Sequence, residues 1–461
     1  MKLKLYICFL LISCLFFSTK NFSQKYGMGA LLDEKYYQDV PEAAELMRSD
    51  YSNLPPFHSI KQYAPTPGNQ GQTSTCTGWA VAYSARTILS AMQFNWTKKQ
   101  INQNTFSPSY IYNQIRPKDG CDVGTSLSDG LKILKEHGAI KTNQFGFDCD
   151  KEVLDEHHLI ADNFKIKEYR QLVNRKTKNK VSLIKKSLSE ENPVVIAINC
   201  PDSFHDVKDV WNPDSSDYSK NFAGHAVTIV SYNDDKENGA FEVMNSWGTE
   251  WGDNGFAWIR YSDFEKFCVW GGELIGLKED SLNKFFNGSI SLNKLNGDKL
   301  NLSLKNKLFS TINPYPSGTQ FQLRVSNNEP AYVYVISSDL SFRTTINFPF
   351  DEFTSAFLPY QNNNILIPGE KYAFQLDEND GITFFCVLYS SAIIDVKRFS
   401  KVVEQKRGTF YDRVNTVITE LGYNKTGNDF ILQTNNEISF STTANNDAVL
   451  PILVSIPHVT D

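Results

Sequence analysis

The sequence lacks several features that would assign it to a specialised class. No segment carries a dense block of basic residues, and the formal net charge is -6, so nucleic acid is not an expected partner. Beyond Phe17 no run is long and apolar enough for a transmembrane helix. No internal repeat of roughly 20–50 residues is present either. These absences favour an ordinary globular protein over a nucleic-acid-binding, membrane-spanning or solenoid one.

The histidines also lack the spacing of metal ligands. Apart from His225, which is considered below, none lies at a metal-ligand spacing from a cysteine. The adjacent pair His157-His158 is expected to be solvated. The sequence therefore predicts no metal site and no cofactor. The histidines concerned are His58, His137, His157, His158, His205 and His458.

Residues 1–23 have the pattern of a secretory signal peptide. Lys2 and Lys4 form a basic start, and residues 5–17 form an apolar run that is too short to span a bilayer comfortably. A small residue then precedes the expected cut, which leaves Gln24 as the mature start. We expect the mature protein to be soluble outside the cytoplasm: secreted, periplasmic or at the cell surface.

A lipoprotein attachment site at Cys14 is the weaker alternative. The segment Leu11-Ile12-Ser13-Cys14 fits such a site, but the apolar run continues to Phe17, whereas a lipidated cysteine normally ends it. Removal of the signal takes Cys8 and Cys14 from the eight cysteines. If one remaining thiol is a nucleophile, an odd number is left, so at least one more is expected to be free. Export permits disulfides, but the count does not choose the partners. The remaining cysteines are Cys76, Cys121, Cys149, Cys200, Cys268 and Cys386.

The chain of 461 residues is long enough for two or three domains. After a short N-terminal segment (residues 24–53), helical patterns come first and strand patterns follow, which predicts an α+β domain over residues 54–277. Residues 278–300 have the composition of a linker, and residues 301–461 form a β-rich accessory domain, expected to be an all-β sandwich. The predicted helices cover residues 77–93, a segment starting at 107–108, and residues 126–137. The predicted strands cover residues 194–198, 226–230, 240–244 and 256–260.

Some local predictions outside that domain matter later. Residues 41–47 are expected to make a helical turn or two, with proline first. Residues 321–325 and 331–336, separated by a turn cluster, predict a β-hairpin. Residues 382–388 are expected to form a strand, and residues 399–422 a single helix.

Four side chains have the chemistry of a thiol-based hydrolase. Cys76 directly precedes the helix at 77–93, whose N-terminus favours a thiolate. His225 opens a buried strand 149 residues later (225 minus 76) and can serve as its base. Asn245 ends another strand, and a neutral amide is enough to orient an imidazole. Gln70 lies in a polar loop that can return a side-chain amide toward the thiol, as an oxyanion donor requires.

These motifs resemble those of the papain family of cysteine peptidases, in a secreted bacterial form. Asn69-Gln70-Gly71 followed by Cys76 resembles the family's active-site loop, and Gly224-His225-Ala226-Val227 resembles its histidine strand. The run Asn245-Ser246-Trp247-Gly248 resembles its asparagine motif. Gly120-Cys121-Asp122-Val123-Gly124 resembles the glycine-rich segment that borders its substrate cleft. The order and interval of the cysteine and histidine also agree with that family.

The resemblance implies a two-lobed papain-like fold and a role for each residue. Cys76 attacks the scissile carbonyl, His225 forms the ion pair and protonates the leaving amine, and Asn245 orients His225. Gln70 and the backbone N–H of Cys76 form the oxyanion hole. Trp247 shields the hydrogen bond between asparagine and histidine. The substrate pocket would be lined by Thr125, Ala197, Ala226 and Trp247.

The sequence also departs from the family pattern. Thr77-Gly78 separates Cys76 from the aromatic Trp79, and Thr73 stands where the family has a cysteine, so the usual loop disulfide is absent. Cys121 must then be free or pair elsewhere, with Cys149 as the nearest candidate. Residues 24–53 are too short for the family's long inhibitory propeptide, so activation by removal of a large pro-domain is not expected.

Three functions remain open on the sequence alone. The first is a secreted endopeptidase that acts on protein or peptide substrates through an acyl-enzyme thioester. The second is a papain-fold thiol amidase or transferase. The third is a catalytically inactive binding or adhesion protein, which the complete set of four site residues disfavours. The C-terminal region loosely resembles a bacterial domain of unknown role found behind peptidase and kinase domains. It is expected to anchor the protein or to bind another protein or a cell-surface component.

Overall fold

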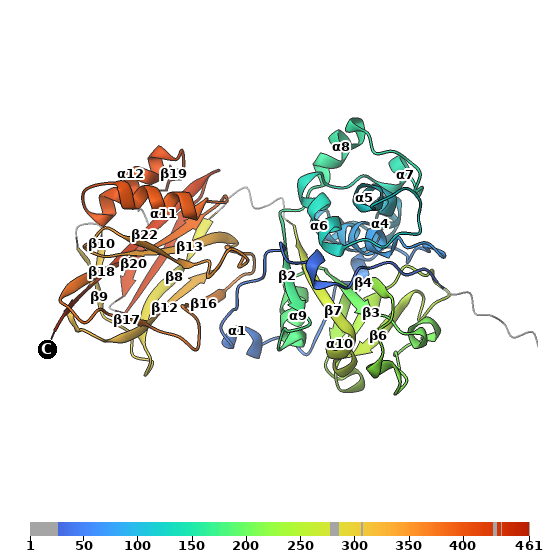
Figure 1. The fold of residues 1–461 in the computed structure, drawn as a ribbon, viewed down its shortest axis with the longest axis horizontal. Coiled ribbons are helices and arrows are strands. Elements are labelled where there is room, and N and C mark those ends of the chain that lie inside the picture. The colour runs from blue at the N-terminus through green and yellow to red at the C-terminus, as the bar shows by residue number, and fades with distance from the viewer. Residues whose placement is uncertain (1–25, 277–284, 306–307, 427–430, 435, 461) are drawn as a thin grey trace, which may run out of the picture.

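The computed structural model describes residues 26–276, 285–305, 308–426, 431–434 and 436–460. It places them in two domains that lie side by side (Figure 1). The signal peptide predicted for residues 1–23, the alternative lipid attachment at Cys14 and the mature start at Gln24 all lie outside these ranges. Within the described ranges, no helix combines the length and the apolar character needed to cross a membrane.

The first domain has a helical half built around one buried helix. Its first turn is α2 (Cys76–Gly78), its middle is the π-helical η3 (Trp79–Arg86), and its end is α3 (Thr87–Gln93), which confirms the helix predicted for residues 77–93. A Cβ at Gly78 would overlap the carbonyl oxygen of Pro108, so only glycine lets this helix approach α5 so closely. The surrounding helices are α4 (Lys98–Gln103), α5 (Pro108–Ile115), α6 (Leu127–Glu136), α7 (Thr142–Phe145) and α8 (Asp155–Ala161).

The second half of this domain is an antiparallel sheet. Its strand order is β2-β7-β3-β4-β5-β6, and β1 pairs with β4. The four strands predicted from apolar patterns are present as β3, β4, β5 and β6. The bounds are β1 (Phe57–Ser59), β2 (Glu168–Asn174), β3 (Val194–Asn199), β4 (Gly224–Asn233), β5 (Ala240–Met244), β6 (Phe256–Arg260) and β7 (Cys268–Ile275), with α9 (Lys180–Ser189) and α10 (Tyr261–Phe267) beside them. The α+β prediction for this domain is confirmed.

The second domain contains two packed sheets. One has the order β14-β13-β18-β22-β10-β9, with β11, β15 and β19 at its margins; the other has the order β16-β12-β8-β21-β20, with β17 beside β12. The bounds are β8 (Phe285–Lys294), β9 (Leu302–Lys305), β10 (Leu308–Thr311), β11 (Tyr315–Pro316), β12 (Gln320–Asn327), β13 (Ala331–Ser338), β14 (Thr344–Phe348), β15 (Phe357–Leu358), β16 (Asn363–Ile367), β17 (Phe374–Gln375), β18 (Gly381–Ser390), β19 (Asn424–Lys425), β20 (Ile431–Thr434), β21 (Glu437–Thr443) and β22 (Ala448–Val459).

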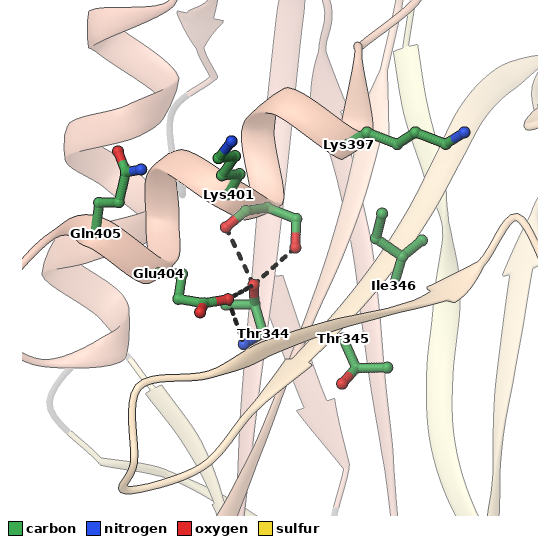
Figure 2. Close-up of a pocket in the computed structure, with 8 residues that line it drawn as sticks. Thr344, Thr345, Ile346, Lys397, Lys401, Glu404 and Gln405 are labelled. Carbon is green, nitrogen blue, oxygen red and sulfur yellow. Dashed lines mark hydrogen bonds between the residues drawn. The ribbon is translucent and has the colours of Figure 1, made fainter.

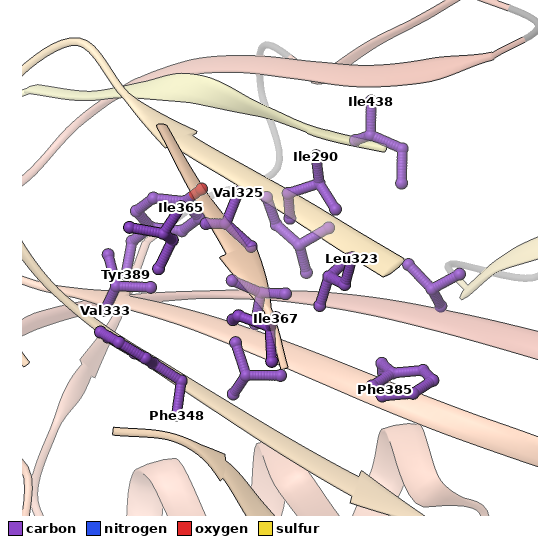
Figure 3. Packing of buried hydrophobic residues seen from close by; sticks show 14 of the residues in the cluster. Ile290, Leu323, Val325, Val333, Phe348, Ile365, Ile367, Phe385, Tyr389 and Ile438 are labelled. Atoms are coloured by element: carbon purple, nitrogen blue, oxygen red, sulfur yellow. The ribbon is translucent and has the colours of Figure 1, made fainter. Parts of the chain in front are cut away.

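Buried apolar side chains from both sheets meet to form the core of this β domain (Figure 3). Val325 on β12 and Val333 on β13 both contribute to it, but from opposite sheets. The β-hairpin predicted for these two strands is therefore wrong. The chain crosses from one sheet to the other at the turn cluster, because each strand buries its apolar side chains against the facing sheet.

Two helices, rather than the single one expected over residues 399–422, cover the outer face of the larger sheet. They are α11 (Val396–Gln405) and α12 (Phe410–Glu420), and Gly408 lies between them with φ +105°. The domain is thus a sandwich with a helical layer and is not purely β. A shallow depression separates α11 from β14, where Thr344 donates from its hydroxyl to the Ser400 carbonyl and to the Glu404 carboxylate (Figure 2).

Two predictions about the connections are wrong. Residues 278–300 were expected to be a linker, but β8 occupies residues 285–294 and lies in the middle of the smaller sheet, because Phe286, Ile290 and Leu292 fill its core. Residues 277–284 lie outside the described ranges. Residues 41–47 contain no helix and run extended between the two domains; the 3-10 turn η1 (Glu34–Tyr36) precedes them and α1 (Ser49–Ser52) follows.

Candidate active site

Cys76 is the first residue of α2 and is fully buried. The first N–H groups of a helix have no partner within the helix and carry partial positive charge, so they stabilise a thiolate placed there. The backbone N–H groups of Ala226 and Thr77 also face the Cys76 sulfur. Because Ala226 directly follows His225, strand β4 places the histidine next to a residue that contacts the thiol.

His225 and Asn245 form a hydrogen bond that fixes the state of the imidazole. The distance between His225 Nε2 and Asn245 Oδ1 is 2.7 Å. The backbone N–H of Ser246 also donates to Asn245 Oδ1 at 2.8 Å, which identifies that atom as the amide oxygen. An oxygen can only accept, so His225 Nε2 carries the proton and Nδ1 keeps a lone pair. His225 Nδ1 is buried and has no hydrogen-bond partner among the described residues, so it is available to accept the thiol proton.

Trp247 covers this hydrogen bond. Its ring stacks on His225 with centroids 4.4 Å apart and 23° between the planes. His205 and Tyr26 also stack on Trp247, at 4.7 Å and 4.9 Å. Excluding water strengthens the bond between histidine and asparagine, because the local dielectric constant falls. The position of Trp247 agrees with its predicted shielding role.

Gln70 is held beside the asparagine motif. Its backbone N–H donates to the Ser246 carbonyl at 2.8 Å, and the Ser246 hydroxyl donates to Gln70 Oε1 at 2.6 Å. The side-chain Nε2 then points away from Ser246 and donates to the carbonyl oxygens of Thr73 and Gly27, at 2.7 Å and 3.0 Å. Such a fixed amide is a suitable donor for an oxyanion.

The chain's own N-terminal segment occupies this site. Residues 26–32, hereafter the blocking segment, lie across Cys76 between the two halves of the domain. Gly29 and Ala30 donate N–H groups to the Gly224 carbonyl, each at 3.0 Å. Leu31 donates to the Thr125 carbonyl at 3.0 Å, and the Thr125 N–H donates to Gly29 at 2.8 Å. The Gly27 carbonyl accepts from Gln70 and, at 3.3 Å, from Trp247 Nε1.

The blocking segment fits the site closely because of its glycines. A Cβ at Gly27 would overlap the Thr73 carbonyl oxygen, and a Cβ at Gly29 would overlap the Ser74 carbonyl oxygen. On the facing wall, a Cβ at Gly224 would overlap the Ala30 carbonyl oxygen. Backbone therefore lies against backbone along this stretch, an approach that only glycine permits.

The same segment covers the residues predicted to line the substrate pocket. Ala197 and Ala226 belong to one buried cluster with Ala30, Tyr37 and Cys76. Thr125 pairs with Ala30 in a parallel bridge, and Trp247 contacts Tyr26. Thr125 and Trp247 thus contact the blocking segment, and Ala197 and Ala226 share a buried cluster with its Ala30, while the role of all four toward a substrate stays a prediction.

The blocking segment lies against the nucleophile. The backbone N–H groups of its Gly29 and Ala30 donate to the Gly224 carbonyl and also lower the pKa of the Cys76 thiol, so both lie close to the sulfur. Residues 24–53 are too short for a long inhibitory propeptide, yet seven of them, residues 26–32, lie across Cys76.

Burial suppresses the ionisation of both groups. Burial raises the pKa of the Cys76 thiol to about 11, although the N–H groups of Ala226, Gly29, Thr77 and Ala30 oppose the rise. Burial lowers the pKa of His225 to about 3, against the hydrogen bond that its Nε2 donates to Asn245, which raises the pKa. At neutral pH the closed site therefore holds a neutral thiol and a neutral imidazole. Water must enter before the ion pair forms.

The structure contains a disulfide between Cys121 and Cys149, the pair considered from the sequence. It fixes the loop that leads to Thr125, and the Cys121 carbonyl accepts from the Ser74 N–H at 2.6 Å. Among the described residues the free cysteines are Cys76, Cys200, Cys268 and Cys386, and all four are buried.

Sequence reasoning missed some contributors to the site. The sequence marks Ser246 only as part of a motif, although its hydroxyl holds Gln70. It marks His205 only as a histidine without metal-ligand spacing, although its ring stacks on Trp247. The alternation Gly27-Met28-Gly29 was the available signal for close backbone contact near the N-terminus.

Together these residues can generate a nucleophilic thiolate next to an oxyanion donor. These are the catalytic groups that a thiol hydrolase requires. Residues 61–271 match the model of the family described as papain family cysteine protease, and residues 314–392 match a domain of unknown function, DUF4384. The first of these regions is a papain-family cysteine protease domain, and the second belongs to the DUF4384 domains.

The relatives share this domain at low identity. An uncharacterised peptidase C1-like protein of Acanthamoeba polyphaga mimivirus is 29% identical over 222 residues, 42% of this chain and 63% of its own. Human cathepsin L2 is 24% identical over 251 residues, 51% of this chain and 66% of its own. This chain therefore spans less than two thirds of either relative. A solved structure of xylellain, a cysteine protease from Xylella fastidiosa, is 20% identical and covers 55% of this chain and 97% of its own, with a TM-score of 0.45.

Proposed function

We propose that this chain is a secreted cysteine endopeptidase that is held inactive by its own blocking segment. The observation that carries the proposal is the 2.7 Å bond between His225 Nε2 and Asn245 Oδ1, which leaves the buried Nδ1 without a hydrogen-bond partner among the described residues. A histidine that only stabilises a core would be expected to have hydrogen-bond partners at both ring nitrogens. The predicted signal peptide supports export.

The proposed reaction begins once the blocking segment leaves. His225 Nδ1 takes the thiol proton, and the Cys76 sulfur attacks the scissile carbonyl carbon to give a tetrahedral oxyanion. Gln70 Nε2 and the backbone N–H of Cys76 stabilise that charge. His225 then protonates the departing amine, and the C–N bond breaks to leave a thioester. Water, deprotonated by His225, hydrolyses the thioester and restores the thiol.

Labelling of the thiol tests this proposal. Residues 33–36 are exposed, so limited proteolysis there separates the blocking segment from the rest of the chain. After the cut, an epoxysuccinyl thiol inhibitor is expected to form an adduct on Cys76, located by mass spectrometry, while the uncut chain reacts far more slowly. The buried Cys200, Cys268 and Cys386 should remain unlabelled.

A Cys76→Ala variant is the control, because it removes the only thiol expected to react. No adduct on Cys76 near neutral pH after complete cleavage at residues 33–36 would contradict the peptidase proposal. Labelling without hydrolysis of any peptide in a library would instead favour the alternative, a thiol amidase or transferase.

Replacing Gln70 tests the oxyanion assignment. We expect Gln70→Ala to lower kcat of the released enzyme by about 10²–10³-fold with little change in KM, because a donor to the oxyanion acts mainly in the transition state. Steady-state kinetics on a peptide substrate measures both constants. The matched control is Gln72→Ala, an exposed glutamine in the same loop. An equal fall for both variants would mean that the loop, and not the Gln70 amide, is responsible.

A further inference from the structure

The chain that follows the blocking segment runs onto the second domain. Residues 41–51, hereafter the anchor segment, lie between the two domains, and α1 at its end is visible there in Figure 1. Only residues 33–40 separate the two segments, and Tyr37 within them is buried. The Tyr37 hydroxyl donates to the Leu31 carbonyl at 2.6 Å, and its ring stacks on Trp270 at 4.7 Å. The connection formed by residues 33–40 is therefore short, and the buried Tyr37 fixes its middle.

Glu42 joins the anchor segment to both domains at once. Its backbone N–H donates to the Phe353 carbonyl at 2.7 Å, and its carbonyl accepts from Ser355 at 2.8 Å. On the other side, Gln171 Nε2 donates to Glu42 Oε1 at 2.7 Å. The neighbouring residues Pro41 and Ala43 form backbone hydrogen bonds with Gln171, an edge residue of the peptidase sheet.

The next residues belong to the β domain in their packing. Ala44 and Leu46 are buried within the core cluster formed by the two sheets of that domain, and Tyr51 packs against it. A side chain that enters a core is held by the packing of the whole domain. These two residues explain why residues 41–47 are extended and not helical.

Polar contacts secure the end of the anchor segment. Met47 donates its N–H to the Asn364 carbonyl at 2.8 Å. Asp50 accepts from the backbone N–H and the side-chain Nδ2 of Asn364, at 2.7 Å and 2.8 Å. Arg48 pairs with Glu370 at 2.8 Å, but its side chain is 84% exposed, so this pair contributes little. The contacts with Asn364 are the firmer ones.

From this arrangement we propose that the β domain retains the blocking segment in the cleft. By fixing the anchor segment it limits how far residues 26–32 can leave the cleft, and it thereby controls the availability of Cys76. Displacement of the anchor segment from the β domain, by a ligand of that domain or by proteolysis, releases the peptidase. The β domain, which includes the domain of unknown function, thereby has a role in anchoring. Only the release of activity rests on the proposed peptidase function.

Loosening the anchor without touching the cleft tests this role. In the full-length protein, Leu46→Ala removes the side chain that enters the β-domain core, and Asp50→Ala removes the acceptor for Asn364. We expect the double variant to speed hydrogen exchange of the backbone amides of residues 29–31 by at least about 10-fold, and labelling of Cys76 by the same factor. Exchange is followed by mass spectrometry under native conditions.

The matched control is Leu453→Ala, which makes the same change at a buried leucine of the β domain on the side that faces α11 and α12. Leu453→Ala destabilises the domain but leaves the anchor segment in place, so exchange at residues 29–31 should stay near the wild-type rate. Unchanged exchange in the double variant, or equal acceleration in both variants, overturns the proposal. Faster exchange without labelling of Cys76 upholds the anchoring role and instead contradicts the peptidase function.

Discussion

Peptide hydrolysis by the released enzyme is expected to fall by at least about 10⁴-fold in kcat/KM when Cys76 is replaced with alanine, because no covalent intermediate can form without the sulfur. The replacement removes a single sulfur atom from the first turn of α2 and adds no bulk, so the fold should be retained. Kinetics on a peptide substrate after cleavage at residues 33–36 measures the effect.

Cys268→Ala is the matched control for this experiment. Cys268 is also a free, buried thiol, but it lies at the start of β7 and makes its contact with the Trp270 carbonyl. Its replacement should leave kcat/KM within a few-fold of wild type. Retention of most of the activity in Cys76→Ala would show that another group is the nucleophile and would remove the basis of the proposed mechanism.

Alanine at both Gly27 and Gly29 is expected to open the cleft. Each new Cβ would overlap a backbone carbonyl of the facing loop, at Thr73 or Ser74, so the blocking segment must shift. Overpacking of this kind costs about 1–3 kcal/mol at each site. A combined cost of about 2 kcal/mol or more corresponds to an increase of about 30-fold or more in the population of the open state. The rate of Cys76 alkylation in the uncut protein should rise by that factor.

Gly130→Ala is the control for this variant, because Gly130 has room for a side chain. A Cβ at Gly130, inside α6, would lie 3.4 Å from its nearest neighbours, which is ordinary contact. Gly130→Ala should therefore leave the alkylation rate unchanged. If the variant with alanines at 27 and 29 reacts no faster than Gly130→Ala, the blocking segment does not limit access to the thiol.

Three of the candidate site residues could be singled out from the sequence because their signals are local. Cys76 precedes a helix, and His225 and Asn245 lie at the ends of buried strands, so residue type and position together indicate their chemistry. The strands β3 to β6 were predictable for the same reason, since their apolar patterns reflect burial on a single sheet.

The failures share a different cause, namely contacts made over long distances along the chain. Residues 41–47 have a helical composition, but Ala44 and Leu46 pack into a core that is otherwise formed by residues beyond 285. The strands β12 and β13 are adjacent in sequence and still join different sheets. The blocking segment could not be predicted because its short length argues against an inhibitory propeptide. Close backbone contact at Gly27 and Gly29, which the length does not reveal, lets it fill the cleft. Tertiary packing overrides local preference at each of these places.

The covalent link between the blocking segment and the domain that it blocks has a consequence for reversibility. A tethered segment competes at an effective concentration in the millimolar range, so an intrinsic affinity of only about 1 μM would keep the cleft almost completely occupied. A cut in the exposed residues 33–36 ends that advantage, because the severed peptide dilutes into the surrounding solution. Cleavage of the link is therefore irreversible: a free peptide of the same sequence should be a poor inhibitor, and a cleaved molecule does not close again.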